Sequence, residues 1–252
     1  MIIKAAYESN IGNNRKKNED NFFFLGKIKD VKSITKSGKT GFIRITSSKD
    51  AVFAVFDGMG GERHGEVASY TATSEMLFSY NKKKITNKGN EEFLADFFNS
   101  ANTAVCEKND ELSNGVMGTT SAVLYLAGNT AWVGNIGDSR IYLLRDKTLK
   151  QISVDHCRKT SDGSKSSTLL QYLGVKEDDF IIEPFIDSFK VRRNDVFLLC
   201  SDGLTDMLSD NEICEIMKKN KKPLSCVSKL INSALNKGGK DNTTVLVCKI
   251  II

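Results

Sequence analysis

The sequence predicts an α/β fold of one domain with mostly antiparallel strands. Short apolar runs typical of strands alternate with longer segments in which apolar residues recur at helical spacing. Several strand-like runs are separated only by turn residues, which is the pattern of β-hairpins. The chain shows no internal repeat and no linker, so residues 1–252 are expected to fold as a single domain.

Strands are predicted wherever short apolar runs are bounded by polar or glycine residues. Residues 27–50 interrupt this pattern, because they are rich in Lys, Ser and Gly and are expected to form an exposed hairpin or loop. Gly128 and Asn129 supply a turn between two later strands. The predicted strands cover residues 2–7, 22–25, 51–56, 119–126, 130–135, 140–145, 149–154, 191–199 and 243–252.

Helices are predicted in two groups. Residues 65–80 and 91–109 carry apolar side chains every three or four positions, which gives each segment one face for a core. Near the C-terminus, a capping-box pattern begins a helix after Ser209. Pro223 starts a last helix, which is expected to end before Gly238.

Composition narrows the class of protein. A hydrophobic content of 40% and a charged content of 27% are typical of a globular protein in water. The net charge of +5 comes largely from short lysine runs beside predicted helix ends, which indicates solvated helix ends rather than a nucleic-acid surface. No apolar run is long enough to span a membrane, and no signal peptide is evident. We expect a cytoplasmic protein that binds neither membranes nor nucleic acid, with reduced cysteines.

Five apolar runs border carboxylates. Asp57, Asp138 and Asp202 each follow such a run, whereas Asp241 and the pair Glu19–Asp20 come just before one. A carboxylate at the end of a buried strand is unfavourable unless its charge is compensated. Several acids at one sheet edge therefore require cations at neutral pH. The pattern predicts a metal site at an edge that the strands share.

An alternative interpretation is that some of these acids only form turns. Asp-Gly is a favoured turn dipeptide, and it occurs at Asp57–Gly58, Asp162–Gly163 and Asp202–Gly203. Asp162–Gly163 is expected to be such a turn, because Ser and Lys residues rather than a strand flank it. The other two share the arrangement of a buried strand followed by an acid, which favours the metal site.

Seven motifs occur in an order that resembles a known enzyme family. They are Arg15-Lys-Lys-Asn-Glu19-Asp20, Asp57-Gly58-Met59-Gly60-Gly61, Gly118-Thr119-Thr120, Gly137-Asp138-Ser139-Arg140, Val154-Asp155-His156, Ser201-Asp202-Gly203-Leu204 and Lys240-Asp241-Asn242-Thr243. Together they resemble the metal-dependent serine/threonine protein phosphatases, the type 2C or PPM family. Met59 after Asp57–Gly58 is similar to the bacterial branch. The resemblance runs from about Arg15 to the C-terminus.

The resemblance implies a fold and a set of site residues. The expected fold is α/β (α+β), a four-layer sandwich of two central antiparallel β-sheets flanked by helices on both faces. The resemblance implies that Asp57 bridges two metals and that the Gly58 carbonyl binds one of them. Asp202 and Asp241 would hold the first metal, Glu19 the second, and Asp138 with Asp202 a third. Asp20 would act through metal-bound water, and Arg15 would bind the substrate phosphate.

The residue types agree with the implied chemistry. Oxygen ligands suit Mn²⁺ or Mg²⁺, and with only two histidines in the chain a histidine-built zinc site is not expected. Two such ions, roughly 4 Å apart, lower the pKa of a bridging water, so a metal-bridging hydroxide is the expected nucleophile. A third ion fits the resemblance. The planar fork of an arginine suits a phosphate group.

Two of these assignments have structural alternatives. Asp138 is equally suited to a structural role, in which it pairs with Arg140 or caps the turn. The structural alternative for Arg15 is a surface pair with Glu19. Residues 155–156 are expected to brace a turn rather than to contact substrate.

The sequence also departs from the family pattern. Met59 stands where eukaryotic members carry a histidine proposed as general acid, and a thioether cannot donate a proton. Residues 157–168 form only a short, polar stretch where members usually carry a longer flap. This segment is expected to be a mobile loop, either a remnant of the flap that lies beside the site and contacts the protein part of a substrate, or a plain surface connection.

The resemblance implies an enzyme that hydrolyses phosphoserine and phosphothreonine on proteins and opposes a bacterial Ser/Thr kinase, acting as a monomer. A catalytically silent phosphoprotein-binding member is the first alternative, which the intact ligand set disfavours. A metal-dependent nuclease is the second, and the chain lacks the basic, aromatic track that single-stranded nucleic acid requires.

Overall fold

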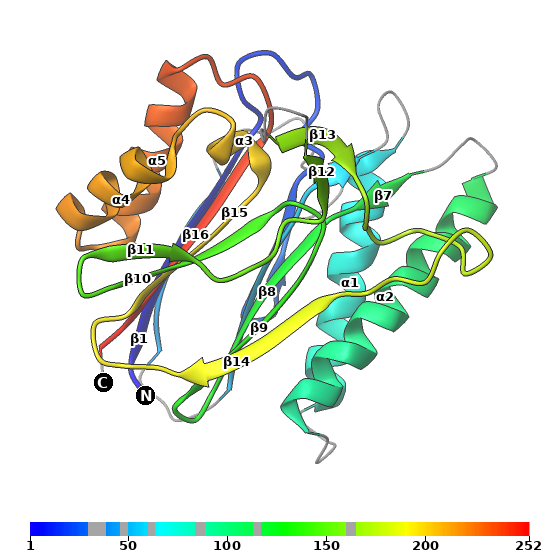
Figure 1. Cartoon of the computed structure of the whole chain (residues 1–252), viewed down its shortest axis with the longest axis horizontal. Helices are drawn as coiled ribbons and strands as arrows, with labels where there is room; N and C mark the ends of the chain where they lie inside the picture. Colours follow the sequence, from blue (N-terminus) through cyan, green and yellow to red (C-terminus); the bar gives the residue numbers. More distant parts are fainter. Residues whose placement is uncertain are drawn as a thin grey trace.

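The structure, a computed structural model, describes residues 1–29, 39–45, 50–59, 64–83, 89–112, 117–159 and 165–251. Two six-stranded sheets pack face to face, and helices cover the outer face of each (Figure 1). The strand pairs are antiparallel throughout the described sheets. The predicted four-layer α/β sandwich is therefore confirmed. No helix in the described ranges is long and apolar enough to cross a membrane.

The first sheet has the strand order β11-β10-β15-β16-β1-β4. Its strands are β1 (Ile3–Asn10), β4 (Lys39–Ile45), β10 (Arg140–Arg145), β11 (Thr148–Gln151), β15 (Val196–Cys200) and β16 (Thr243–Ile250). The helices α4 (Asp210–Lys219) and α5 (Pro223–Asn236) pack on its outer face, on the left of Figure 1. The predicted capping box at Ser209 is present and begins α4.

The second sheet has the strand order β14-β9-β8-β5-β2-β3. Its strands are β2 (Asn21–Phe24), β3 (Lys27–Ile28), β5 (Ala51–Phe56), β8 (Ser121–Ala127), β9 (Thr130–Ile136) and β14 (Phe185–Lys190). The helices α1 (Gly65–Lys83) and α2 (Asn90–Leu112) cover its outer face, on the right of Figure 1. Both helices lie where the apolar periodicity predicts them.

Two short strand pairs and a short helix lie near one end of the sandwich. The strand β6 (Gly58–Met59) pairs with β7 (Gly118–Thr119), and β12 (Cys157–Lys159) pairs with β13 (Lys165–Leu169). The short helix α3 (Asp202–Thr205) follows β15 directly. Asp57–Gly58 and Asp202–Gly203 are therefore not simple hairpin turns, which removes the alternative interpretation of these two dipeptides. Asp162–Gly163 lies outside the described residues.

The central strands are buried on both faces, which explains their continuous apolar runs. In β5, Ala51, Phe53 and Val55 belong to the core between the two sheets. The alternate residues, Val52, Ala54 and Phe56, belong to the core beneath α1 and α2. Since successive side chains of a strand point to opposite faces, each of these six residues packs against a different layer from its neighbours.

Some boundaries predicted from the sequence are wrong. Residues 27–50 are not only a hairpin or loop, because β3 and β4 lie within them and β4 pairs with β1 along its length. The strand expected at 191–199 begins only at Val196, and β14, which precedes it, was not predicted. Residues 157–168 contain most of the β12–β13 pair rather than a loop alone. Residues 30–38 and 160–164 lie outside the described parts of the chain.

Gly203 provides a test of the close packing that joins α3 to β16. A Cβ atom at Gly203 would lie 2.0 Å from the Asn242 carbonyl oxygen. Because that atom belongs to the backbone, we expect Gly203→Ala to lower the free energy of unfolding by about 1–3 kcal/mol, the usual cost of overpacking. Each kcal/mol corresponds to roughly 2–4 °C in Tm for a chain of this size.

Gly89→Ala is the matched control, because the nearest atom to its new Cβ is 3.9 Å away. Thermal unfolding of both variants with and without Mn²⁺ measures the difference. Equal Tm shifts in the two variants would contradict the packing described here.

Candidate active site

The strand registers bring the acid-bearing junctions to one end of the sandwich. Phe56, the last residue of β5, pairs with Asn21, the first residue of β2. Asp57 therefore lies beside the Glu19–Asp20 pair. The end of β9 pairs with the start of β8, which itself pairs with the end of β5, so Asp138 comes to the same end.

The first sheet contributes the remaining acids in the same way. The end of β15 pairs with the start of β16, which brings Asp202 and Asp241 together. Acids from both sheets then face one cavity of about 440 Å³. The charged residues that line it are Arg15, Glu19, Asp57, Asp138, Asp202 and Asp241. The expected gathering of acids at a shared edge is thus found, and Gly58 and Met59 lie in the same wall.

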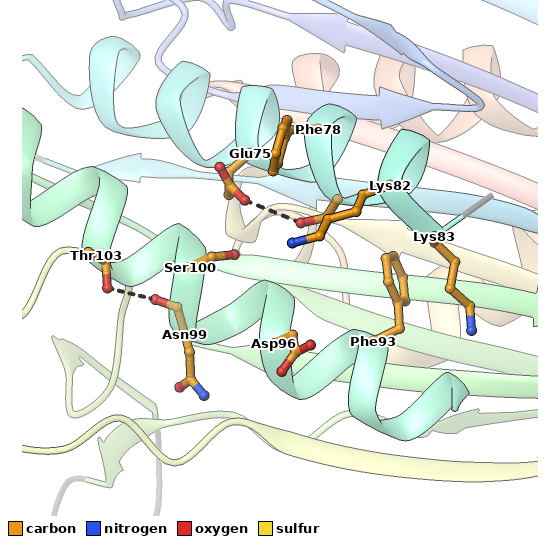
Figure 2. A pocket seen from close by; sticks show the side chains of 10 residues that line it. Glu75, Phe78, Lys82, Lys83, Phe93, Asp96, Asn99, Ser100 and Thr103 are labelled. Carbon is orange, nitrogen blue, oxygen red and sulfur yellow. Dashed lines mark hydrogen bonds between the residues drawn. The ribbon is translucent and has the colours of Figure 1, made fainter. Parts of the chain in front are cut away.

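A second cavity, between α1 and α2, differs in character (Figure 2). Its charged side chains, which include Glu75, Lys82 and Asp96, are spread along the two helices rather than converging on one point. Its polar groups also bond locally, as Ser79 does to Glu75 at 3.2 Å. The acid-lined cavity is therefore the candidate active site.

The backbone around Asp57 is tightly held. Thr120 Oγ1 accepts a hydrogen bond from the Asp57 amide at 3.0 Å, and Thr119 Oγ1 donates to the Asp57 carbonyl at 2.9 Å. Gly58 packs so closely that a Cβ atom there would lie 2.1 Å from the Gly65 carbonyl oxygen. These contacts fix the direction in which the Asp57 carboxylate and the following backbone face the cavity.

Asp20 lies behind the cavity and is fully buried, at 0% exposure. Ser201 Oγ donates to Asp20 Oδ2 at 2.7 Å, and within the described residues Asp20 Oδ1 has no hydrogen-bond partner. Ser201 also accepts from the Thr244 amide at 2.9 Å, so Asp20 is tied to both β15 and β16. A buried carboxylate oxygen without a partner is unfavourable and indicates a missing cation or water.

Arg15 contacts a different acid from the one that the structural alternative named. Its Nη2 donates to Asp241 Oδ2 at 2.6 Å, so the pair is with Asp241 and not with Glu19. Asn242 fixes the adjoining loops, because its Oδ1 accepts from the Glu19 amide at 2.7 Å and its Nδ2 donates to the Lys17 carbonyl at 2.8 Å. One side chain thus links the Glu19 loop to the Asp241 loop.

Arg140, the ion-pair partner named in the structural alternative for Asp138, binds a different acid. Arg140 forms its close ion pair with Asp155, at 2.6 Å, and donates to that carboxylate from two nitrogens. His156 Nδ1 accepts from the Gly137 amide at 3.2 Å, which braces the turn that carries Asp138. The expected bracing role of residues 155–156 agrees with these contacts.

The comparisons with known proteins agree with this arrangement. The family described as Protein phosphatase 2C matches residues 40–235 of the chain. The chain belongs to this family. The serine/threonine phosphatase stp of Listeria monocytogenes is 32% identical over 212 residues, which are 78% of this chain and 83% of that protein.

Solved structures of phosphatases share the fold of this family member. The crystal structure of the Mycobacterium tuberculosis serine/threonine phosphatase PstP/Ppp has a TM-score of 0.80 at 28% identity and covers 100% of both chains. A structure of the PstP catalytic domain, at 28% identity and the same coverage, has a TM-score of 0.77 and contains two manganese ions.

The acids of this phosphatase 2C member lie in an environment that disfavours their charged forms. Burial, followed by the charge of Asp138, raises the pKa of Asp202 to about 7. Burial raises the pKa of Glu19 to about 7 and that of Asp20 to about 6. The pKa of Asp57 is also raised, first by burial and then by the neighbouring carboxylates. Cations at the site would remove this penalty.

Sequence reasoning missed one cation close to these acids. Lys29 is only 3% exposed, its Nζ donates to the Asn18 carbonyl at 2.8 Å, and its charge lowers the pKa of Asp20. No pattern in the sequence indicates this, because Lys29 lies in a stretch whose composition predicts an exposed loop. A lysine at this depth partly compensates the charge of Asp20.

The donor set fits Mn²⁺ or Mg²⁺ better than zinc, since carboxylates and one backbone carbonyl supply only oxygen. Within the described ranges, no three acid, histidine or cysteine side chains already lie close enough to enclose one ion. Mg²⁺ and similar ions keep several waters and use only one or two carboxylates directly, so an open arrangement suits them. The unpartnered Asp20 Oδ1 is one oxygen that such water would satisfy.

The raised pKa values predict how the metal-free protein responds to pH. Glu19 and Asp202 titrate near 7 in the folded chain, but near their usual values of about 4 when it unfolds. The folded state therefore binds more protons between about pH 4 and pH 7, so stability falls as pH rises through this window. With excess chelator, we expect Tm to drop by several degrees between pH 5.5 and pH 8.

Mn²⁺ should raise Tm more at pH 8 than at pH 5.5. At pH 8 the acids have lost the protons that reduce their repulsion at pH 5.5, so the bound ions relieve a larger penalty. Asp57→Asn should reduce the slope of Tm against pH in the metal-free protein. If the Tm of the unaltered protein in chelator does not change with pH, the acids do not repel one another as described here.

Proposed function

We propose that this phosphatase hydrolyses phosphoserine and phosphothreonine on proteins with two divalent cations, Mn²⁺ or Mg²⁺, held by the acid-lined cavity. The supporting observation is the convergence of Arg15 with five carboxylates on one cavity in a chain of the phosphatase 2C family. The two manganese ions in the related PstP catalytic domain support the same number of ions here.

The proposed ligands are those that the family resemblance implies, and most of them line the cavity. Asp57 would bridge both ions, and the Gly58 carbonyl would bind one of them. Asp202 and Asp241 hold the first ion, and Glu19 holds the second. The other contributors are Asp20, which acts through bound water from behind the cavity, and Asp138, which with Asp202 holds a third ion.

When bound, the two ions supply a water of lowered pKa as nucleophile and neutralise charge on the phosphate oxygens. The chain's own residues position these partners. Thr119 and Thr120 hold the backbone that presents Asp57, and Asn242 keeps the Glu19 and Asp241 loops at a fixed spacing.

Arg15 is proposed to bind the substrate phosphate. In the structure it neutralises Asp241, and about half of its side chain is exposed. An ion at Asp241 would take over that role, and the guanidinium would then be released to donate two hydrogen bonds to a phosphate at the cavity mouth. Arg15 thus has a partner in both states.

The rest of the cavity bears on the substrate. Met59 lines it and offers no proton for the leaving group, so a metal-bound water or another group would have to supply that proton. Thr168 and Leu169 also line the cavity, which supports a position for the end of the 157–168 segment beside the reacting phosphate. We propose that this segment contacts the protein part of the substrate. The proposed partners are proteins phosphorylated by a bacterial Ser/Thr kinase. The phosphatase is proposed to act on them in the cytoplasm as a monomer.

The first test of this function removes the metal or its ligands. Phosphopeptide hydrolysis should vanish in excess chelator and return with Mn²⁺ or Mg²⁺. Asp57→Ala and Asp241→Ala should each lose activity and Mn²⁺ binding but remain folded, because removing an acid relieves repulsion in the metal-free site. Undiminished turnover in chelator, or an unchanged rate in Asp57→Ala, would contradict the proposal.

The second test concerns Arg15. A charged hydrogen bond contributes roughly 1.5–3 kcal/mol, so Arg15→Ala should lower kcat/KM by about ten- to a hundredfold. Mn²⁺ affinity should not fall, since the arginine competes with the ion for Asp241. Lys16→Ala is a matched control on the neighbouring, exposed position. A loss of Mn²⁺ affinity in Arg15→Ala without a change in kcat/KM would make Arg15 a structural partner of Asp241 instead.

A further inference from the structure

A carboxylate outside the predicted ligand set lies near Glu19, the acid proposed to hold the second cation. Glu66, in the first turn of α1, is only 8% exposed. Its Oε1 accepts from Lys17 Nζ at 3.0 Å. Its Oε2 is buried and, in the described part of the chain, has no hydrogen-bond partner. A carboxylate buried to this extent with one unsatisfied oxygen requires a donor or a cation.

The surroundings of Glu66 show which donor would reach it. Of the charged groups that shift the pKa of Glu19, Glu66 has the largest effect, and it raises that pKa. A Cβ atom at Gly65, the residue before Glu66, would lie 2.8 Å from the Gly58 carbonyl oxygen and 3.0 Å from Glu19 Cδ. The first turn of α1 therefore packs directly against the two groups proposed to hold the second ion.

The backbone of Glu19 is fixed by the same helix. Ser69 Oγ, one turn after Glu66, donates to the Glu19 carbonyl at 2.6 Å. The Glu19 backbone is thereby held beside the first turns of α1. Two carboxylates held against each other in a buried position repel, and Lys17, half exposed, neutralises only one oxygen of the pair.

We propose that Glu66 is an additional acid of the second cation position, with Oε2 accepting a hydrogen bond from water bound to the ion at Glu19 and Gly58. The inference rests on the proposed two-metal function. Oε1 stays on Lys17, so the ion pair orients the carboxylate rather than satisfying it. Groups that hold metal-bound water or orient metal ligands typically change metal affinity by 10–100-fold when they are removed.

The test is a Mn²⁺ titration, by calorimetry, of the full chain and of Glu66→Gln. The glutamine keeps the size of the side chain and an acceptor for Lys17 but lacks the charge. We expect the weaker of the two Mn²⁺ dissociation constants to rise about tenfold or more, the tighter one to stay within a factor of two, and kcat at saturating Mn²⁺ to recover most of its value.

Two controls separate this role from a structural one. Lys17→Met removes the ion pair but keeps the Glu66 charge, so it should weaken Mn²⁺ binding much less than Glu66→Gln does. Glu75→Gln changes an acid on the same helix that lines the other cavity, and it should leave both dissociation constants unchanged. A structural role for the Lys17–Glu66 pair would instead weaken Mn²⁺ binding equally in Lys17→Met and Glu66→Gln.

The outcomes also distinguish this inference from the proposed function. If the unaltered chain binds two Mn²⁺ ions and Glu66→Gln binds them equally well, the role of Glu66 is refuted and the two-metal function stands. If the unaltered chain binds no Mn²⁺, both fail. Loss of both ions together in Glu66→Gln, with a lowered Tm in chelator, would show a folding defect and also overturn the specific role.

Discussion

The repulsion among carboxylates at one end of the sandwich is the constraint on which the rest of the site depends. Acids from both sheets reach this end because antiparallel pairing places the end of one strand beside the start of the next. Their charges are only partly compensated within the chain, by Arg15 at Asp241 and by the buried Lys29 near Asp20. Burial and mutual repulsion therefore favour protons, or cations, at the remaining acids.

The rigid surroundings of these acids make sense under this constraint. An acid that could turn towards solvent would escape the repulsion and would not hold an ion. Thr120 and Asn242 prevent such movement by binding the backbones of Asp57 and Glu19. The close approach of Gly58 to Gly65 and of Gly203 to Asn242 leaves no room for the loops to shift. The repulsion lowers the stability of the metal-free site, but the fixed arrangement of the acids keeps the cation position open and preorganised.

Much of this could be predicted from the sequence because the signals are local. A strand buried on both faces is a continuous apolar run, and an acid at its end is visible in the next residue, as at Phe56 and Asp57. Edge strands are harder to predict. The strand β14 has one neighbour and partly exposed side chains, so its sequence mixes polar and apolar residues and resembles a loop.

Contacts between distant residues could not be predicted for a different reason. Glu66 is an ordinary first-turn acid in the sequence, and only the tertiary packing of Gly65 on Gly58 brings the first turn of α1 beside Glu19. The pairing of Arg15 with Asp241 joins residues that are 226 positions apart, whereas Glu19 is the nearer acid along the chain. Sequence spacing ranks such partners by proximity along the chain, but tertiary structure decides between them.

The most direct measurement of the central claim is the number of protons released when Mn²⁺ binds. Calorimetric titrations at one pH in two buffers of different ionisation enthalpy give this number. Since the pKa values of Glu19 and Asp202 are raised to about 7, we expect close to one proton or more to be released at pH 6 and far less at pH 8.5. Tight Mn²⁺ binding at pH 6 with no proton released would contradict the claim that the cations replace protons on mutually repelling acids.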